Sequence, residues 1–136
     1  MNQESPDSPK KTKILVVDDE TAITQMLDLN LSATGNYEVL TTNESLKAKA
    51  LAAEFLPDIL LLDVVMPGLD GGDVLREIRS IPELSQVPAV MVTALVSNKE
   101  ISHDGVVTTG DCVMLPKPVR LARLINTIEM VLANEL

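Results

Sequence analysis

The chain is poor in aromatic side chains and in basic charge. Its 136 residues include one tyrosine, one phenylalanine and no tryptophan. Sites for single-stranded nucleic acid stack bases on aromatic rings, so this composition argues against such a site. The 20 acidic and 11 basic residues give a net charge of −9, which repels phosphate backbones. We therefore expect no direct binding to nucleic acid.

Cysteine and long apolar runs are also scarce. Cys112 is the only cysteine, which excludes an internal disulfide and fits a reducing compartment. The N-terminal stretch MNQESPDSPKKTK has no apolar segment of the kind that signal peptides carry. No apolar run approaches the length of a membrane span. These absences lead us to expect a cytoplasmic protein with no membrane partner.

Short apolar segments alternate with segments of helical periodicity along the rest of the chain. Residues 1–12 are polar and predict a disordered tail, and residues 13–136 predict one domain. The expected strands are 14–17, 37–42, 58–63, 88–94 and 111–115, and the expected helices are 21–33, 45–55, 72–80 and 119–134. This alternation favours an α/β fold with a doubly wound, five-stranded parallel sheet covered by helices on both faces.

Polar side chains follow these apolar strands abruptly. Asp18 and Asp19 follow the first strand, Asp63 the third, Thr93 the fourth and Lys117 the fifth. The carboxyl ends of parallel strands meet at one edge of the sheet, so we expect these residues to converge there. Converging carboxylates repel one another and favour a hard divalent cation such as Mg²⁺. A lysine and a hydroxyl beside such an ion suit phosphoryl transfer, in which a carboxylate can be the nucleophile.

Four motifs together resemble one known family. They are ILVVDDE, LLLDVVMPGLDG, the pair Thr93–Ala94 and LPKP, each placed after a predicted strand. In this order they are similar to the receiver domain of two-component response regulators (CheY-like), over roughly residues 12–134. The resemblance implies a flavodoxin-like (βα)5 fold with strand order 2-1-3-4-5. It also implies a Mg²⁺-dependent switch that receives a phosphoryl group from a phosphohistidine.

The resemblance assigns a role to each of the converging residues. Asp63 is the implied phosphoacceptor, and Thr93 and Lys117 are the implied catalytic groups that bond phosphoryl oxygens. The implied Mg²⁺ ligands are the carboxylates of Asp18, Asp19 and Asp63 and the backbone carbonyl of Val65. The Lys117–Pro118 peptide bond resembles one that is usually cis in this family.

The implied partners are a sensor histidine kinase or a histidine phosphotransfer protein, and an unknown downstream protein that reads the switched surface. Such a domain catalyses its own phosphorylation and dephosphorylation without being a conventional multiple-turnover enzyme. The chain ends directly after its last predicted helix, and we expect a stand-alone receiver.

The sequence departs from the family pattern at several positions. Met114 stands where the family commonly has tyrosine or phenylalanine, which affects the usual coupling between the threonine and an aromatic side chain. Residues 97–111 are poor helix material, so we expect a short or irregular fourth helix. Val65 and Leu95 lie two positions beyond Asp63 and Thr93 and cannot orient an attacking water. Slow self-dephosphorylation is our hypothesis.

Other interpretations remain for the chain and for single residues. A receiver-like interaction module without phosphorylation is one alternative, and a phosphatase with an aspartyl nucleophile is another. A Rossmann or P-loop nucleotide binder is the weakest alternative, because neither glycine fingerprint follows a strand.

Single residues have structural roles in our expectations. We expect Asp70 to cap the next helix, Gly71 to adopt a conformation that a Cβ disfavours, and Met26 and Met91 to lie in the core.

Overall fold

A six-stranded sheet forms the centre of the computed structural model, which describes residues 10–94, 107–109 and 112–134. The strands are β1 (Thr12–Val17), β2 (Tyr37–Thr42), β3 (Ile59–Leu62), β4 (Ala89–Thr93), β5 (Val107–Thr109) and β6 (Cys112–Pro116). Their order across the sheet is β2-β1-β3-β4-β6-β5. The first five in this order are parallel, which confirms the predicted 2-1-3-4-5 arrangement, and β5 adds an antiparallel strand at the edge.

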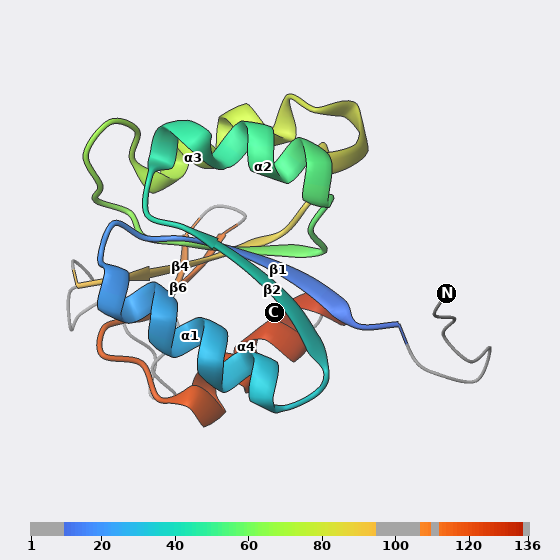
Figure 1. The fold of residues 1–136 in the computed structure, drawn as a ribbon, viewed down its shortest axis with the longest axis vertical. Helices are drawn as coiled ribbons and strands as arrows, with labels where there is room; N and C mark the ends of the chain where they lie inside the picture. Colours follow the sequence, from blue (N-terminus) through green and yellow to red (C-terminus); the bar gives the residue numbers. More distant parts are fainter. Residues whose placement is uncertain (1–9, 95–106, 110–111, 135–136) are drawn as a thin grey trace.

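Helices cover both faces of the sheet and produce three layers. They are α1 (Thr21–Ala33), α2 (Ala48–Phe55), α3 (Gly71–Arg79) and α4 (Leu121–Leu132), with short 3-10 turns η1 (Ser45–Lys47) and η2 (Pro82–Leu84). Helices α2 and α3 lie on one face, and α1 and α4 lie on the other (Figure 1). Within the described residues, no helix has both the length and the apolar character needed to cross a lipid bilayer.

The central strands are apolar throughout because both of their faces are buried. Leu60 and Leu62 of β3 point into the core beneath α2 and α3, together with Met91 of β4. Ile59 and Leu61 point into the second core, beneath α1 and α4. All four residues of β3 are at most 1% exposed. A strand of this kind needs no polar face, which explains the unbroken run ILLL.

The region of the expected fourth helix is only partly described. Residues 107–109 form strand β5, in keeping with the β-branched Val107, Thr108 and Thr109. The rest of residues 97–111 lies outside the described part of the chain, and so does Leu95. At the N-terminus, β1 begins at Thr12, the last residue of the predicted tail, and residues 1–9 are likewise outside.

One core assignment was wrong. Met91 is 4% exposed and belongs to the core, but Met26 on α1 is 41% exposed. Apolar residues recur along α1 at helical spacing, yet only Leu27 and Leu31 of them are buried against the sheet. The helical spacing of the apolar residues predicted this helix correctly. The face of the helix that is buried against the sheet is narrower than its stripe of apolar residues, so part of that stripe is exposed.

The turn between β3 and α3 depends on glycine and on a helix cap. Gly68 has a φ of +86°, a conformation that L-residues with a Cβ rarely adopt. Asp70 caps α3 as predicted: its carboxylate accepts a hydrogen bond of 2.8 Å from the backbone N–H of Asp73.

The expectation of an unusual backbone at Gly71 was wrong. Its φ is not positive, and the constraint there is space, because a Cβ would lie 2.5 Å from the carbonyl oxygen of Asp63.

Replacing Gly71 by alanine should therefore lower the free energy of unfolding by about 1–3 kcal/mol, the usual cost of forcing atoms into a filled space. Gly72→Ala is the matched control, since its Cβ would meet only ordinary contacts at 3.4 Å and beyond. This control should be neutral or more stable by up to ~1 kcal/mol, because alanine is the better helix former. Urea denaturation measures both changes. Equal stability of the two variants would contradict the packing argument.

Candidate functional site

Two buried carboxylates lie at the carboxyl edge of the sheet. Asp18 and Asp63 directly follow the paired strand ends Val17 and Leu62. The backbone N–H of Asp63 donates to the carbonyl of Val17 at 3.0 Å, and that of Asp18 donates to the carbonyl of Thr42 at 3.2 Å. Both residues are thus fixed by continuation of the parallel ladder. Their exposures are only 3% and 7%, unusual values for aspartate.

The Lys117 ammonium joins these carboxylates. Its Nζ lies 2.9 Å from Asp18 Oδ2, 2.9 Å from Glu20 Oε1 and 3.3 Å from Asp63 Oδ2. An ammonium group has three N–H donors, so each donor has one carboxylate partner. Residues from three separate chain segments therefore meet at one charged cluster, which we call the Lys117 cluster (Asp18, Glu20, Asp63 and Lys117).

Thr93 and Lys117 are connected through the backbone. Thr93 ends β4, is 2% exposed, and pairs with Pro116 at the end of β6. Its carbonyl accepts a hydrogen bond of 2.9 Å from the N–H of Lys117. The Lys117–Pro118 bond is cis, as the resemblance implied. Thr93 and Lys117 therefore lie at the same edge of the sheet as Asp18 and Asp63.

The two acids that follow Asp18 do not lie as expected: Asp19 is not grouped with the other carboxylates, and Glu20 joins them. Asp19, a predicted Mg²⁺ ligand, is exposed and is not a member of the group of described carboxylates whose oxygens lie within 4.8 Å of one another. That group consists of Asp18, Glu20 and Asp63. Sequence analysis missed Glu20. Its only signal was its place as the third acid of the run DDE, at the residue that precedes helix α1.

Burial and charge oppose each other in the Lys117 cluster. Burial raises the pKa of the Asp18 carboxyl above its ordinary value of 3.8, although the backbone N–H of Glu20 and the Lys117 ammonium both favour the charged form. Burial alone would lower the pKa of Lys117. Hydrogen bonds to Glu20 and Asp18 outweigh that effect and raise its pKa above the ordinary 10.5, which keeps the ammonium charged.

The donor set of the Lys117 cluster fits a hard divalent cation. Its acids offer carboxylate oxygens within 4.8 Å of one another, and Mg²⁺ prefers oxygen ligands of this kind. With all groups ionised, the three carboxylates and the one ammonium leave an excess of two negative charges. A divalent cation would neutralise this excess.

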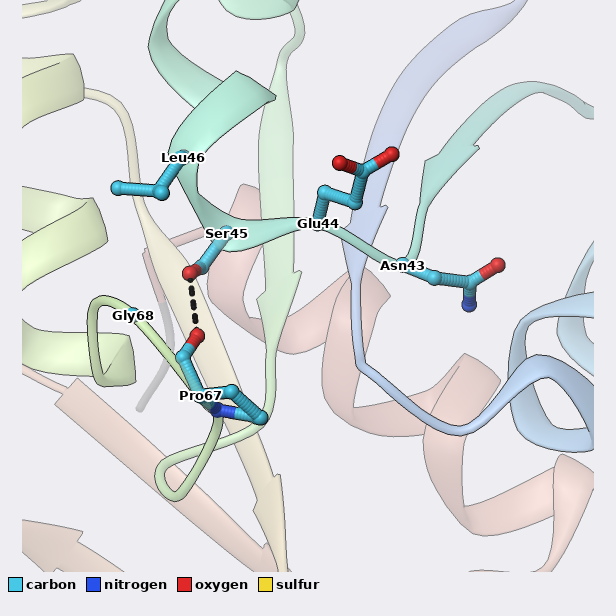
Figure 2. Close-up of a pocket in the computed structure, with 6 residues that line it drawn as sticks. All are labelled: Asn43, Glu44, Ser45, Leu46, Pro67 and Gly68. Carbon is cyan, nitrogen blue, oxygen red and sulfur yellow. Dashed lines mark hydrogen bonds between the residues drawn. The ribbon is translucent and has the colours of Figure 1, made fainter.

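A serine ties down the loop that follows Asp63. Ser45 Oγ donates to the carbonyl of Pro67 at 2.8 Å (Figure 2). It also accepts from the N–H of Leu69 at 2.9 Å. The same segments line a surface pocket of about 210 Å³. Val65, in this loop, is 57% exposed. The loop is therefore held at its distal end while Val65 faces solvent.

An asparagine performs the corresponding role for the loop after β1. Asn43 Nδ2 donates to the carbonyl of Asp18 at 2.8 Å and to Thr24 Oγ1 at 2.9 Å. These bonds connect the end of β2, the acidic loop and helix α1. Together with the bond from the Glu20 N–H to Asp18 Oδ1 at 2.9 Å, they fix the carboxylate of Asp18 in place.

These observations define a class: a doubly wound α/β domain with a lysine-bridged acidic site at the carboxyl edge of its sheet. A family model for the response regulator receiver domain matches residues 14–129. The chain belongs to the response regulator receiver family, which confirms the resemblance. Response regulator PleD of Caulobacter vibrioides is similar, with 47% identity over 83 residues, or 61% of this chain and 18% of PleD.

Solved structures of receiver domains share the fold. The chemotaxis protein CheY4 of Vibrio cholerae superposes with a TM-score of 0.76 at 26% identity, covering 90% of this chain and 99% of CheY4. The receiver domain of the sensor histidine kinase PA1611 from Pseudomonas aeruginosa superposes with a TM-score of 0.73 at 25% identity, covering 91% and 99%. That structure is described as having a magnesium ion coordinated in its active-site cleft.

The curated relatives are longer than the matched region. The chain spans 18% of PleD, and between a third and a half of several relatives that are named transcriptional regulators. One of these relatives is named as DNA-binding. The expected absence of nucleic-acid binding is therefore not confirmed by the comparisons and stays a prediction.

Asp18→Asn should raise the free energy of unfolding at pH 7 in Mg²⁺-free buffer. Asparagine resembles the protonated carboxyl, and a raised pKa means that folding disfavours the charged form. Because the native state holds this proton more tightly than the unfolded state, the contribution of Asp18 to stability falls as the pH rises above about 3.8. The advantage of the variant should accordingly vanish at lower pH.

Urea denaturation at a series of pH values measures this effect. Asp28→Asn is the control for the loss of one negative charge, since Asp28 is an exposed carboxylate on α1 outside the Lys117 cluster. A less stable Asp18→Asn variant at pH 7 would contradict the assigned cost of burying this charge.

Proposed function

We propose that this domain is a phosphorylation switch whose acceptor is Asp63. The observation that carries the proposal is the position of its carboxylate: buried at the end of β3 and 3.3 Å from the Lys117 ammonium. Membership of the receiver family supports the same role. The phosphoryl donor is a phosphohistidine on a sensor histidine kinase or a histidine phosphotransfer protein, and we place the reaction in the cytoplasm.

The proposed reaction is a single phosphoryl transfer. A carboxylate oxygen of Asp63 attacks phosphorus and forms an acyl phosphate. The bond between phosphorus and the donor imidazole nitrogen breaks, and its electron pair stays on that nitrogen, which takes up a proton. Lys117 pairs with one phosphoryl oxygen and the Thr93 hydroxyl donates to another. The rigid ends of β3, β4 and β6 orient these three side chains before the donor arrives.

Mg²⁺ is the proposed cofactor. When bound, it supplies positive charge that stabilises the phosphoryl oxygens during transfer. The carboxylates of Asp18, Asp19 and Asp63 and the backbone carbonyl of Val65 would hold it. The oxygen-rich composition of the Lys117 cluster and its excess negative charge support Asp18 and Asp63 in this role. Asp19 and Val65 are assigned from the resemblance to the receiver family alone.

A groove beside the Lys117 cluster is the proposed docking surface for the phosphohistidine-bearing partner. It has a volume of about 450 Å³. Its lining is Glu20, Ile23, Met26, Leu27, Val92, Ala94, Lys117, Pro118 and Val119. This lining is largely apolar, joins α1 to the residues after β6, and includes Lys117 of the cluster. A partner seated here would bring its imidazole to the acceptor. The exposure of Met26, unexplained by packing, agrees with this role.

Incubation with acetyl phosphate and Mg²⁺ should add the mass of one phosphoryl group to the wild-type chain. Asp63→Asn should show no addition, because the amide is not a nucleophile, and Asp28→Asn should behave as the wild type. Intact-protein mass spectrometry measures the addition. No addition to the wild type would favour the non-phosphorylated module, and many turnovers of a small phosphoester would favour the aspartyl phosphatase.

The phosphorylated chain should lose its phosphoryl group slowly, over minutes or longer. Val65 is exposed in the loop that follows Asp63, and its apolar side chain cannot hydrogen-bond an attacking water. Val65→Asn should therefore shorten the lifetime of the phosphoryl group, whereas Leu29→Asn, at an exposed position on α1, should leave it unchanged. Mass spectra recorded after removal of the donor follow the decay. A wild-type half-life of seconds would be inconsistent with this view of Val65.

A further inference from the structure

We propose that Glu20 is a positioning residue that holds the Lys117 ammonium in the resting protein and releases it when a phosphoryl group enters the site. The inference rests on the proposed function, because it describes how Glu20 regulates the same site. Glu20 and Lys117 are 97 residues apart in the chain, yet Glu20 Oε1 lies 2.9 Å from Lys117 Nζ.

The ammonium of Lys117 has no spare donor in the resting protein. Lys117 has three N–H groups, and the three carboxylates of the Lys117 cluster engage them. In the proposed reaction Lys117 must donate to a phosphoryl oxygen. It can do so only if one carboxylate gives up its bond.

Burial decides which carboxylate gives way. The side chains of Asp18 and Asp63 are 4% and 8% exposed, whereas that of Glu20 is 59% exposed. A buried carboxylate that loses its cation is left charged and poorly solvated, which is costly. A released Glu20 carboxylate returns to water. Asp63 is the nucleophile and loses its free charge on becoming the acyl phosphate, so the comparison lies between the two carboxylates that stay charged. Of Asp18 and Glu20, the exposed Glu20 gives up Lys117 at the lower cost.

Local structure also leaves Glu20 free to move. Its backbone begins helix α1, and its carbonyl accepts hydrogen bonds from Ile23 and Thr24. Its side chain makes no capping bond to that helix. Asp18, by contrast, is held by a second bond from the N–H of Glu20. The Glu20 side chain can thus swing away while the backbone around it stays in place.

Three variants test the proposal in the full chain. Glu20→Gln removes the charge, and Glu20→Asp keeps the charge but is too short by one methylene to reach Lys117. Glu44→Gln is the control for net charge, since Glu44 is an exposed acid that pairs with Lys47 outside the cluster. The rate of phosphorylation of Asp63 by acetyl phosphate is measured by mass spectrometry over a series of Mg²⁺ concentrations, and the variants are compared at saturating Mg²⁺.

Both Glu20 variants should be phosphorylated about two- to fivefold faster than the wild type, since a partly exposed ion pair contributes up to ~1 kcal/mol. The control should match the wild type. A second measurement reports on Lys117 itself. Its ammonium hydrogens should exchange slowly with water in nuclear magnetic resonance spectra of the wild type, and faster in both Glu20 variants.

Each contrary outcome is decisive. Unchanged rates in both variants would overturn the proposal. A faster Glu20→Gln beside an unchanged Glu20→Asp would also overturn it, because charge repulsion alone would explain the data. Slower phosphorylation with a weaker response to Mg²⁺ would make Glu20 a metal ligand instead. A wild type that accepts no phosphoryl group would overturn the proposed function itself, and this inference with it.

Discussion

One ammonium group among three carboxylates is the interaction on which the edge of this domain depends. Asp18 and Asp63 are buried at neighbouring strand ends, where two like charges would repel each other without compensation. Lys117 supplies that compensation from the far side of β4. The backbone bond from Lys117 to Thr93 then ties the compensating charge to the sheet. The pairing of the strands thus places Lys117 where its charge balances the two buried carboxylates.

Most of the fold was predictable because burial on both faces leaves a strong pattern. The run ILLL of β3 has no polar residue because both faces of the strand are buried and none of its four residues reaches solvent. Helix α1 begins and ends where the sequence indicated, since Thr21 follows the acids and Gly35 follows the last turn. The edge strand β5 was missed, because three β-branched residues beside a glycine predict an irregular segment as readily as a strand.

The site was predictable to the extent that strand ends define it. Asp18, Asp63 and Lys117 converge because parallel strands share one carboxyl edge. No comparable rule predicts in which direction a side chain in a loop points. Consecutive acids after β1 looked equivalent in sequence, yet Asp18 is buried, Asp19 is exposed, and Glu20 reaches across to Lys117. Met26 shows the same limit on a helix, since periodicity cannot tell a core contact from an open groove.

The sheet separates two apolar cores that share little besides strand backbone. One lies beneath α2 and α3, and the other beneath α1 and α4 (Figure 1). Side chains on opposite faces do not touch, so substitutions in one layer leave the packing of the other nearly unchanged. Substitutions that reshape the groove beside α1 can consequently accumulate without disturbing the opposite layer. This partition gives the domain two halves that can change independently around one shared acidic edge.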